Sequence, residues 1–236
     1  MADFIFKRNE QKYLLSPEQA DIFLAAMEQY MQPDKFPTSS IRNIYYDTPD
    51  YRLIRCSLEK PVYKEKLRLR AYGDVTPDSR VFLEMKKKYR GTVYKRRIAL
   101  TEREATAYMA DPEKRLDDSQ IGRELDYFKQ FYGELFPALY LSYDRRSWRS
   151  KEQGLRITLD CNIRYRTTDV ALTAPPSGET LLQDGQYLAE IKSPGAMPLW
   201  LVRVLTDAKI RPTSYSKYGT AYLRLLKEHK IQCRGF

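Results

Sequence analysis

The 236-residue sequence is poor in several residue types that commonly carry catalysis or bind metals. Its one histidine, His229, excludes a multi-histidine metal centre and leaves a single candidate for a histidine-dependent triad. The three cysteines are far apart and form no CxxC pair, which argues against a disulfide framework and a thiolate zinc site. Neither a P-loop motif nor GxGxxG occurs. Carboxylates, lysines, arginines and metal ions remain for any chemistry.

Long apolar runs are also missing. No stretch approaches the roughly 18 to 20 residues of a membrane-spanning helix, and the first residues lack the order of a secretory signal peptide. We therefore expect a soluble, cytoplasmic protein. Because 42% of the residues are hydrophobic and no repeat or long linker interrupts the sequence, we predict a single domain over residues 1–236.

Positive charge is in excess. The chain has 41 Lys and Arg against 31 Asp and Glu, a formal net charge of +10. This balance favours a polyanionic partner, which could be nucleic acid, an acidic membrane surface or a phosphate-rich small molecule. A basic surface that serves only solubility is the alternative. The position of the charges along the predicted strands decides between them.

The pattern of apolar residues and turns predicts an α+β fold. A helix begins near Ser16, where Pro17 and Gln19 complete a capping box, and it ends before Pro33. Further helices are predicted at 102–110, 121–132, 198–208 and about 216–228. Strands are predicted at 4–15, 41–47, 62–72, 80–89, 92–101, 138–148, 155–160, 163–168 and 186–193. We expect a closed antiparallel β-barrel of about eight strands, with helices packed outside and at its ends.

One face of the predicted strands is charged. Alternate residues of a strand point to opposite sides of the sheet. In the strand at 62–72 one side carries Lys64, Lys66, Arg68 and Arg70. The strands at 80–89, 92–101, 155–160 and 186–193 alternate similarly. A Glu-x-Lys unit recurs as Glu10/Lys12, Glu84/Lys86 and Glu190/Lys192.

An ordinary half-exposed sheet would explain any one of these strands. The repetition favours a barrel whose apolar face lies outside, under the helices, and whose charges point into the lumen. Burying an unpaired ammonium group costs several kcal/mol, so we expect a water-filled tunnel that binds a polyanion. Lys and Arg would hold phosphate oxygens, and Glu would hold a bridging divalent metal. These are the parts needed for phosphoryl transfer.

The sequence resembles the triphosphate tunnel metalloenzymes, and within them the catalytic domain of the vacuolar transporter chaperone (VTC), a polyphosphate polymerase. The resemblance covers nearly the whole chain. The matching segments, in order, are 10–13 (EQKY), 45–48 (YYDT), 66–73 (KLRLRAYG), 84–86 (EMK), 94–97 (YKRR), 143–145 (YDR), 155–160 (LRITLD), 190–192 (EIK) and 216–218 (SKY). The hydrolase branch of these enzymes opens with E-x-E-x-K. Here Arg8 replaces the first Glu, which moves the likeness toward the polymerases.

The resemblance implies roles for individual residues. The implied phosphate-binding residues are Lys12, Lys66, Arg68, Arg70, Lys86, Lys95, Arg145, Arg156, Lys192 and Lys217. Among them, Arg68, Arg70 and Lys217, together with Glu190, are implied to be catalytic. Glu190 would bind Mn²⁺ or Mg²⁺; Glu84 and Glu10 are further metal candidates, although either could instead orient a neighbouring lysine. We expect Tyr45, Tyr46 and Tyr143 to pack rather than to stack on bases.

Three functions follow as hypotheses. The first is transfer of the γ-phosphoryl group of ATP to a growing polyphosphate, releasing ADP; no general base is required because the acceptor oxygen is already ionised. The second is hydrolysis of tripolyphosphate or a nucleoside triphosphate, with Glu10 or Glu84 orienting water. The third is a non-catalytic module for RNA or polyphosphate, with nucleic acid disfavoured because the cationic face contains no aromatic residue before Tyr72. The sequence leaves the true donor and the oligomeric state open.

Overall fold

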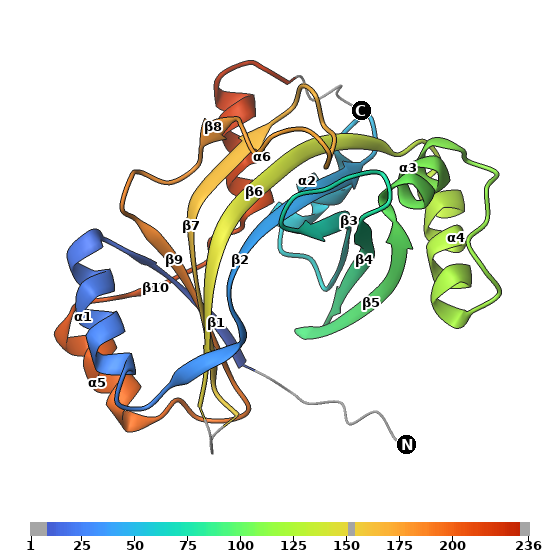
Figure 1. Cartoon of the computed structure of the whole chain (residues 1–236). Coiled ribbons are helices and arrows are strands. Elements are labelled where there is room, and N and C mark those ends of the chain that lie inside the picture. Colours follow the sequence, from blue (N-terminus) through green and yellow to red (C-terminus); the bar gives the residue numbers. More distant parts are fainter. Residues whose placement is uncertain (1–8, 151–153, 232–236) are drawn as a thin grey trace. The chain divides into compact units, whose positions relative to one another are not determined.

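A computed structural model describes residues 9–150 and 154–231, which form ten β-strands and six α-helices (Figure 1). The strands are β1 (Asn9–Leu15), β2 (Gln32–Asp47), β3 (Tyr63–Tyr72), β4 (Arg80–Tyr89), β5 (Thr92–Thr101), β6 (Phe136–Arg149), β7 (Arg156–Arg166), β8 (Glu179–Thr180), β9 (Tyr187–Ser193) and β10 (Pro212–Thr213). The helices are α1 (Pro17–Met27), α2 (Arg52–Leu58), α3 (Glu102–Ala110), α4 (Gln120–Tyr132), α5 (Leu199–Asp207) and α6 (Lys217–Lys227). The α+β class is confirmed.

The strands form one sheet in the order β10-β1-β9-β7-β6-β2-β3-β4-β5, with β8 paired to β7. The pairs β1–β9, β3–β4, β4–β5 and β7–β9 are antiparallel. Within residues 9–150 and 154–231, no pairing joins β10 to β5 at the two ends of this order. The predicted closure into a barrel is therefore not confirmed.

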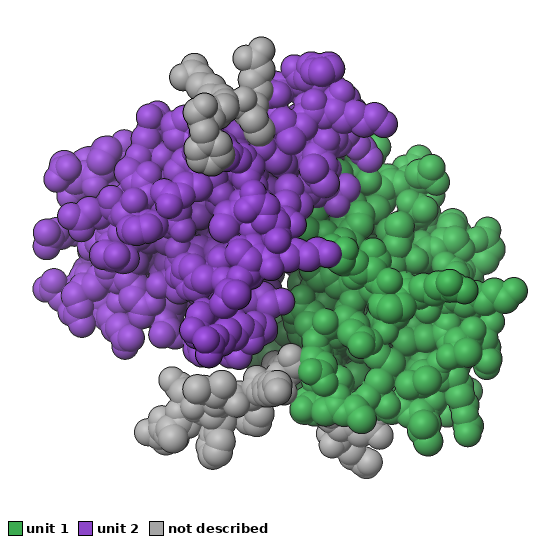
Figure 2. Space-filling model, turned by 180° about the vertical axis from the view of Figure 1, so that it is seen from behind, with its two compact units in different colours: residues 1–40, 143–163, 180–216 green, residues 41–142, 164–179, 217–236 purple. Residues whose placement is uncertain are grey.

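The chain divides into two compact units, coloured separately in Figure 2. Unit 1 comprises residues 1–40, 143–163 and 180–216, and unit 2 comprises 41–142, 164–179 and 217–236. The long strands β2, β6 and β7 contribute residues to both. A single domain over 1–236 stays a prediction.

In unit 1 two helices cover one face of the sheet. Phe23 and Met27 of α1 and Leu201 of α5 are buried with Ile157 of β7 and Ile191 of β9. Helix α1 begins as predicted, because the Ser16 hydroxyl accepts from the backbone of Gln19 and the Gln19 side chain accepts from the backbone of Ser16. This apolar face leaves the opposite face of β1, β9 and β7 to polar side chains.

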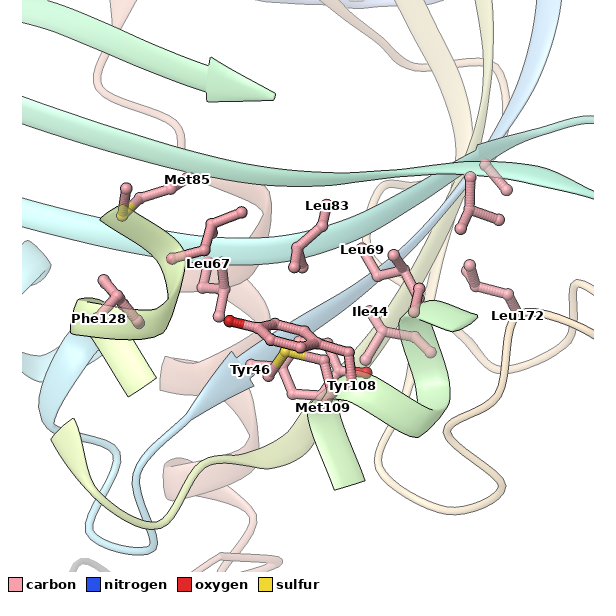
Figure 3. Close-up of a cluster of buried hydrophobic side chains, with 14 of the residues drawn as sticks. Ile44, Tyr46, Leu67, Leu69, Leu83, Met85, Tyr108, Met109, Phe128 and Leu172 are labelled. Carbon is pink, nitrogen blue, oxygen red and sulfur yellow. The ribbon is translucent and has the colours of Figure 1, made fainter. Parts of the chain in front are cut away.

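Unit 2 has the same layering. Leu67 of β3 and Leu83 and Met85 of β4 lie on one side of the sheet, against Tyr108 of α3 and Phe128 of α4 (Figure 3). Burying a large apolar side chain contributes about 1.5–3 kcal/mol, so this packing fixes which strand face is apolar. The charged alternate residues therefore lie on the other face, as the sequence pattern predicts.

Some element boundaries differ from the predictions. Strand β7 is continuous where two strands were predicted, and Asn162 inside it has a φ of 51°. Strand β2 begins at Gln32 rather than Ile41, and the short helix α2 was not predicted. The first part of the predicted strand 4–15 lies outside the described residues. Within the described residues, β1 begins at Asn9. No helix formed by residues 9–150 and 154–231 is both long and apolar enough to cross a bilayer.

Candidate phosphate-binding and metal-binding faces

Strands β3, β4 and β5 of unit 2 carry a dense array of cations on the face opposite the apolar core. The register places Lys64 opposite Lys88, Lys66 opposite Lys86, and Lys86 opposite Lys95. Glu84 lies between Arg68 on one side and Arg97 on the other. We name eight cations of this array the cation ladder: Lys64, Lys66, Arg68, Arg70, Lys86, Lys88, Lys95 and Arg97; Arg80 lies on the same face at the start of β4.

Glu84 is the one carboxylate that β3, β4 and β5 contribute to this face, and its side chain is 1% exposed. Its Oε1 lies 2.7 Å from Lys95 Nζ and accepts from Arg97 Nε at 2.6 Å, while Oε2 accepts from Arg68 Nε at 2.8 Å. Burial alone would raise the pKa of Glu84. The combined attraction of Arg68, Arg70 and Lys95 outweighs burial and holds that pKa well below the usual range. Glu84 is therefore an ionised hub that aligns the cations around it.

The lysine pairs of the ladder oppose like charges. Residues directly opposite on antiparallel strands have Cβ atoms about 4.5–5.5 Å apart, where two like charges are destabilising. Burial lowers the pKa of Lys64, and the neighbouring Lys88, Lys60 and Lys86 lower it further. On this face the three strands contribute the eight ladder cations, Arg80 and one carboxylate. An excess of positive charge of this kind favours the binding of a polyanion.

Strand β2 adds polar partners to the ladder. Arg68 Nη1 donates to the Tyr45 hydroxyl at 3.3 Å, and Arg70 Nε donates to Asn43 Oδ1 at 2.9 Å. Burial raises the pKa of Tyr45, but Arg68, Lys66 and Arg70 lower it to about 8. Tyr45 is 8% exposed, as expected for a packing residue, yet its hydroxyl also belongs to the ladder.

A buried hydrogen bond fixes the start of α6, whose first residue is Lys217. The Tyr218 hydroxyl donates to Asp47 Oδ2 at 2.8 Å, and the Tyr218 ring stacks on Tyr45 with centroids 4.7 Å apart. Asp47 is fully buried and also accepts from the backbone N–H groups of Leu53 and Ile54 at the start of α2. Tyr45 and Asp47 thus contact Tyr218 directly, and all three belong to unit 2.

In unit 1 the register of β1 and β9 places four charged residues in a square. Glu10 lies opposite Lys192, and Lys12 lies opposite Glu190. Lys12 Nζ is 3.8 Å from Glu10 and 3.9 Å from Glu190, and Lys192 Nζ is 3.9 Å from Glu10 and in closer contact with Glu190. Burial raises the pKa of Glu190, but Lys192, Lys12 and Arg145 lower it below the usual range. We name these four residues the charge square.

The remaining predicted cations of unit 1 have carboxylate partners. Arg145 donates from Nε and Nη2 to the two carboxylate oxygens of Asp160, at 2.6 and 2.8 Å. Arg156 lies opposite Lys192 and forms an ion pair with Asp34 at 3.0 Å. These pairs make the face of unit 1 nearly balanced in charge.

A divalent metal fits the charge square better than it fits Glu84. Among residues 9–150 and 154–231, no group of three or more His, Cys, Asp and Glu side chains could hold an ion. Glu84 is already enclosed by cations. Glu10 and Glu190 supply two carboxylates on adjacent strands, and the Thr158 hydroxyl, opposite Glu190 in register, is buried without a hydrogen-bond partner among the described residues. Mg²⁺ commonly binds through one or two carboxylates and completes its shell with water and substrate phosphates.

The structure thus places the predicted strand residues on two faces, one in each unit, and it places Lys217 at the start of α6 in unit 2. Whether these faces line a single tunnel stays a prediction. The implied set omitted Lys64 in unit 2, although strand alternation placed it on the charged side. It also omitted Asn43 and Thr158, since an uncharged polar residue gives little sequence signal.

Comparisons with known proteins found one matching family model and solved structures with a similar fold. The family model described as the VTC domain matches residues 7–226. An adenylyl cyclase from Hippeastrum, described as having a dominant triphosphatase activity, aligns with a TM-score of 0.56 at 19% identity, covering 94% of this chain and 96% of its own. An adenylate cyclase from Bacillus halodurans aligns with a TM-score of 0.55 at 15% identity, covering 88% and 92%. No curated protein matches the chain.

Proposed function

The chain belongs to the VTC domain family, and on this premise we propose that it transfers the γ-phosphoryl group of ATP to the end of a polyphosphate chain, releasing ADP. The cation ladder is the observation that carries the proposal, because β3, β4 and β5 present eight cations on one face and contribute one carboxylate to it. A face with such an imbalance binds an anion of high charge density.

The length of the ladder supports a polymeric substrate. Lys64 and Arg70 are six residues apart on β3, and a strand rises by about 3.3 Å per residue, so the ladder extends for roughly 20 Å. A triphosphate is shorter than this. Additional phosphates beyond the third would therefore still meet cations.

The proposed reaction needs charge neutralisation and alignment more than proton transfer. A terminal oxygen of the polyphosphate forms a bond to the γ-phosphorus, the bond from that phosphorus to the β,γ-bridging oxygen breaks, and the electron pair leaves with ADP. Arg68 and Arg97 present guanidinium groups already aligned by Glu84. Preorganised donors of this kind are each worth about 10²–10³ in rate.

We assign Glu84 to positioning and the pair Glu10 and Glu190 to the metal. Glu84 has its oxygens occupied by three close cations, so a metal would have to displace them. Glu10, Glu190 and the Thr158 hydroxyl offer oxygen donors of the kind that Mg²⁺ and Mn²⁺ prefer. A bound divalent cation would supply neutralisation of phosphate charge. Lys12 and Lys192 would bind the phosphate oxygens beside it.

Hydrolysis of a triphosphate is the second candidate. It is supported by the Hippeastrum neighbour, which is described as having a dominant triphosphatase activity. A hydrolase needs a group that orients water. Because Glu84 is enclosed, Glu10, with a side chain 32% exposed, is the better candidate for that role.

Incubation of the purified chain with ATP and Mn²⁺ tests the proposal. Polyphosphate and ADP in proportion to the phosphoryl groups transferred would support synthesis, whereas orthophosphate without chain growth would support hydrolysis. Binding of polyphosphate with neither product would support the non-catalytic module. Loss of turnover in Arg68→Met and its retention in Arg96→Met, on the opposite face of β5, would tie the activity to the ladder.

A further inference from the structure

The charge square contains its own counter-ions. Each lysine, Lys12 and Lys192, lies within 4 Å of both Glu10 and Glu190. The ammonium groups assigned to phosphate are thus held by the carboxylates assigned to a metal. Lys12 also donates to the backbone carbonyl of Tyr215 at 3.3 Å, so it is held from a second side.

A divalent cation and a phosphate group would each weaken the Lys–Glu contacts of the charge square. Each ligand would thereby make it easier for the other to bind. A divalent cation at Glu10 and Glu190 repels the two ammonium groups and removes the attraction that holds them. Phosphate oxygens that attract Lys12 and Lys192 leave the two carboxylates without their counter-ions. The first ligand therefore lowers the free-energy cost of binding the second.

The Thr158 hydroxyl gives independent support for a ligand at this place. Thr158 lies directly opposite Glu190 on β7, so the two side chains share a face. It is 3% exposed, and its oxygen has no hydrogen-bond partner among the described residues. A buried hydroxyl without a partner is costly, and a cation or its water at Glu190 would satisfy it.

We infer that the charge square is a coupling element in which a divalent cation on Glu10 and Glu190 releases Lys12 and Lys192 to bind phosphate. This inference rests on the proposed function, since it takes the same ligands. It adds that at the charge square either ligand alone binds weakly and that the two bind there cooperatively. Cooperativity of this kind is reciprocal and commonly amounts to about 5–150-fold in affinity.

Calorimetric titrations of the full chain test the coupling with Mn²⁺ alone, tripolyphosphate alone and tripolyphosphate at fixed Mn²⁺. We expect Mn²⁺ to tighten tripolyphosphate binding by about tenfold or more. In Lys12→Met/Lys192→Met, Mn²⁺ alone should bind more tightly than in the wild type, and the coupling should disappear. Lys35→Met removes the same charge from an exposed position of unit 1 and should preserve it.

Mn²⁺ and tripolyphosphate also associate in solution, so a second variant isolates the contribution of the protein. Without Mn²⁺, Glu10→Gln/Glu190→Gln should bind tripolyphosphate more tightly than the wild type. Adding Mn²⁺ should change the affinity of this variant for tripolyphosphate only by the amount that the association of Mn²⁺ with tripolyphosphate in solution explains. Equal responses of this variant and the wild type would overturn the coupling. If no variant binds tripolyphosphate, the proposed function itself fails.

Discussion

The charged faces of the two units differ in how completely their charges cancel. In unit 1, two lysines contact two glutamates, and Arg145 and Arg156 have their own carboxylates. In unit 2, β3, β4 and β5 contribute the eight ladder cations and one carboxylate, Glu84, which contacts four of them. The difference indicates that the ladder can attract a polyanion without help, whereas the square must first exchange its internal partners for ligands.

Removing Glu84 should have the largest effect, because its carboxylate contacts four cations of the ladder. We expect Glu84→Gln to destabilise the fold by about 3–5 kcal/mol, the cost of breaking an ion pair in which one partner is buried. Urea unfolding of the variant and the wild type measures this. Glu102→Gln alters a carboxylate on α3 instead and serves as the control. An unchanged free energy of unfolding would show that Glu84 is not the hub.

The same variant gives a pH signature. The pKa of Glu84 is lower in the folded chain than its ordinary value of about 4.3. Its contribution to stability is therefore fully present above that value and is lost as the pH falls toward the folded pKa. Unfolding free energies below pH 5 should fall less steeply in Glu84→Gln than in the wild type. Parallel slopes would contradict the assignment.

Arg68→Met should lower the rate of phosphoryl transfer by about 10²–10³-fold, as expected for one preorganised donor. Arg96→Met removes the same type of charge from the opposite face of β5, where Arg96 contacts Glu124 at 3.1 Å. We expect its rate to stay within a few-fold of the wild type. Equal losses in the two variants would indicate that overall charge matters rather than the ladder.

Tyr218→Phe keeps the ring on Tyr45 but removes the hydrogen bond to Asp47. A hydrogen bond to a charged group contributes about 1.5–3 kcal/mol, so thermal unfolding should show a loss of that order. Because α6 begins at Lys217, we also expect a raised KM for ATP at saturating metal. A loss of stability with an unchanged KM would limit Tyr218 to a structural role.

Titration of Tyr45 is the mildest test of the ladder. The difference in ultraviolet absorbance between the wild type and Tyr45→Phe should show a phenol with a pKa of about 8. Polyphosphate should raise that pKa, because its charge screens Arg68, Lys66 and Arg70. If the pKa of Tyr45 lies near the ordinary value of about 10 and does not change with polyphosphate, the positive electrostatic potential inferred for the ladder is contradicted.

Strand alternation made the faces predictable from sequence. Side-chain direction in a strand follows position alone, so the contrast between Leu67 and Arg68 identified the apolar and charged sides without coordinates. The paired motif Glu190-x-Lys192 likewise placed both groups on one face of β9.

The partners across strands were not predictable, because register depends on the whole sheet. The contact of Glu84 with Arg97 and the square formed by β1 and β9 required the pairing of strands. Helix α2 was missed because Tyr51 at its start makes no side-chain cap. Asp47, which accepts from the backbone at the start of that helix, also binds Tyr218, 171 residues away in the sequence.

Binding of polyphosphate by Lys86→Met and Lys87→Met tests the account most directly. These neighbours on β4 point to opposite faces: Lys86 lies between Lys66 and Lys95 in the ladder, and Lys87 lies 3.7 Å from Glu65 and Glu124 on the other side. We predict that Lys86→Met weakens binding by about tenfold and reduces its salt dependence, while Lys87→Met leaves both nearly unchanged. Equal weakening by the two variants would contradict the claim that the charged face of the sheet binds phosphate.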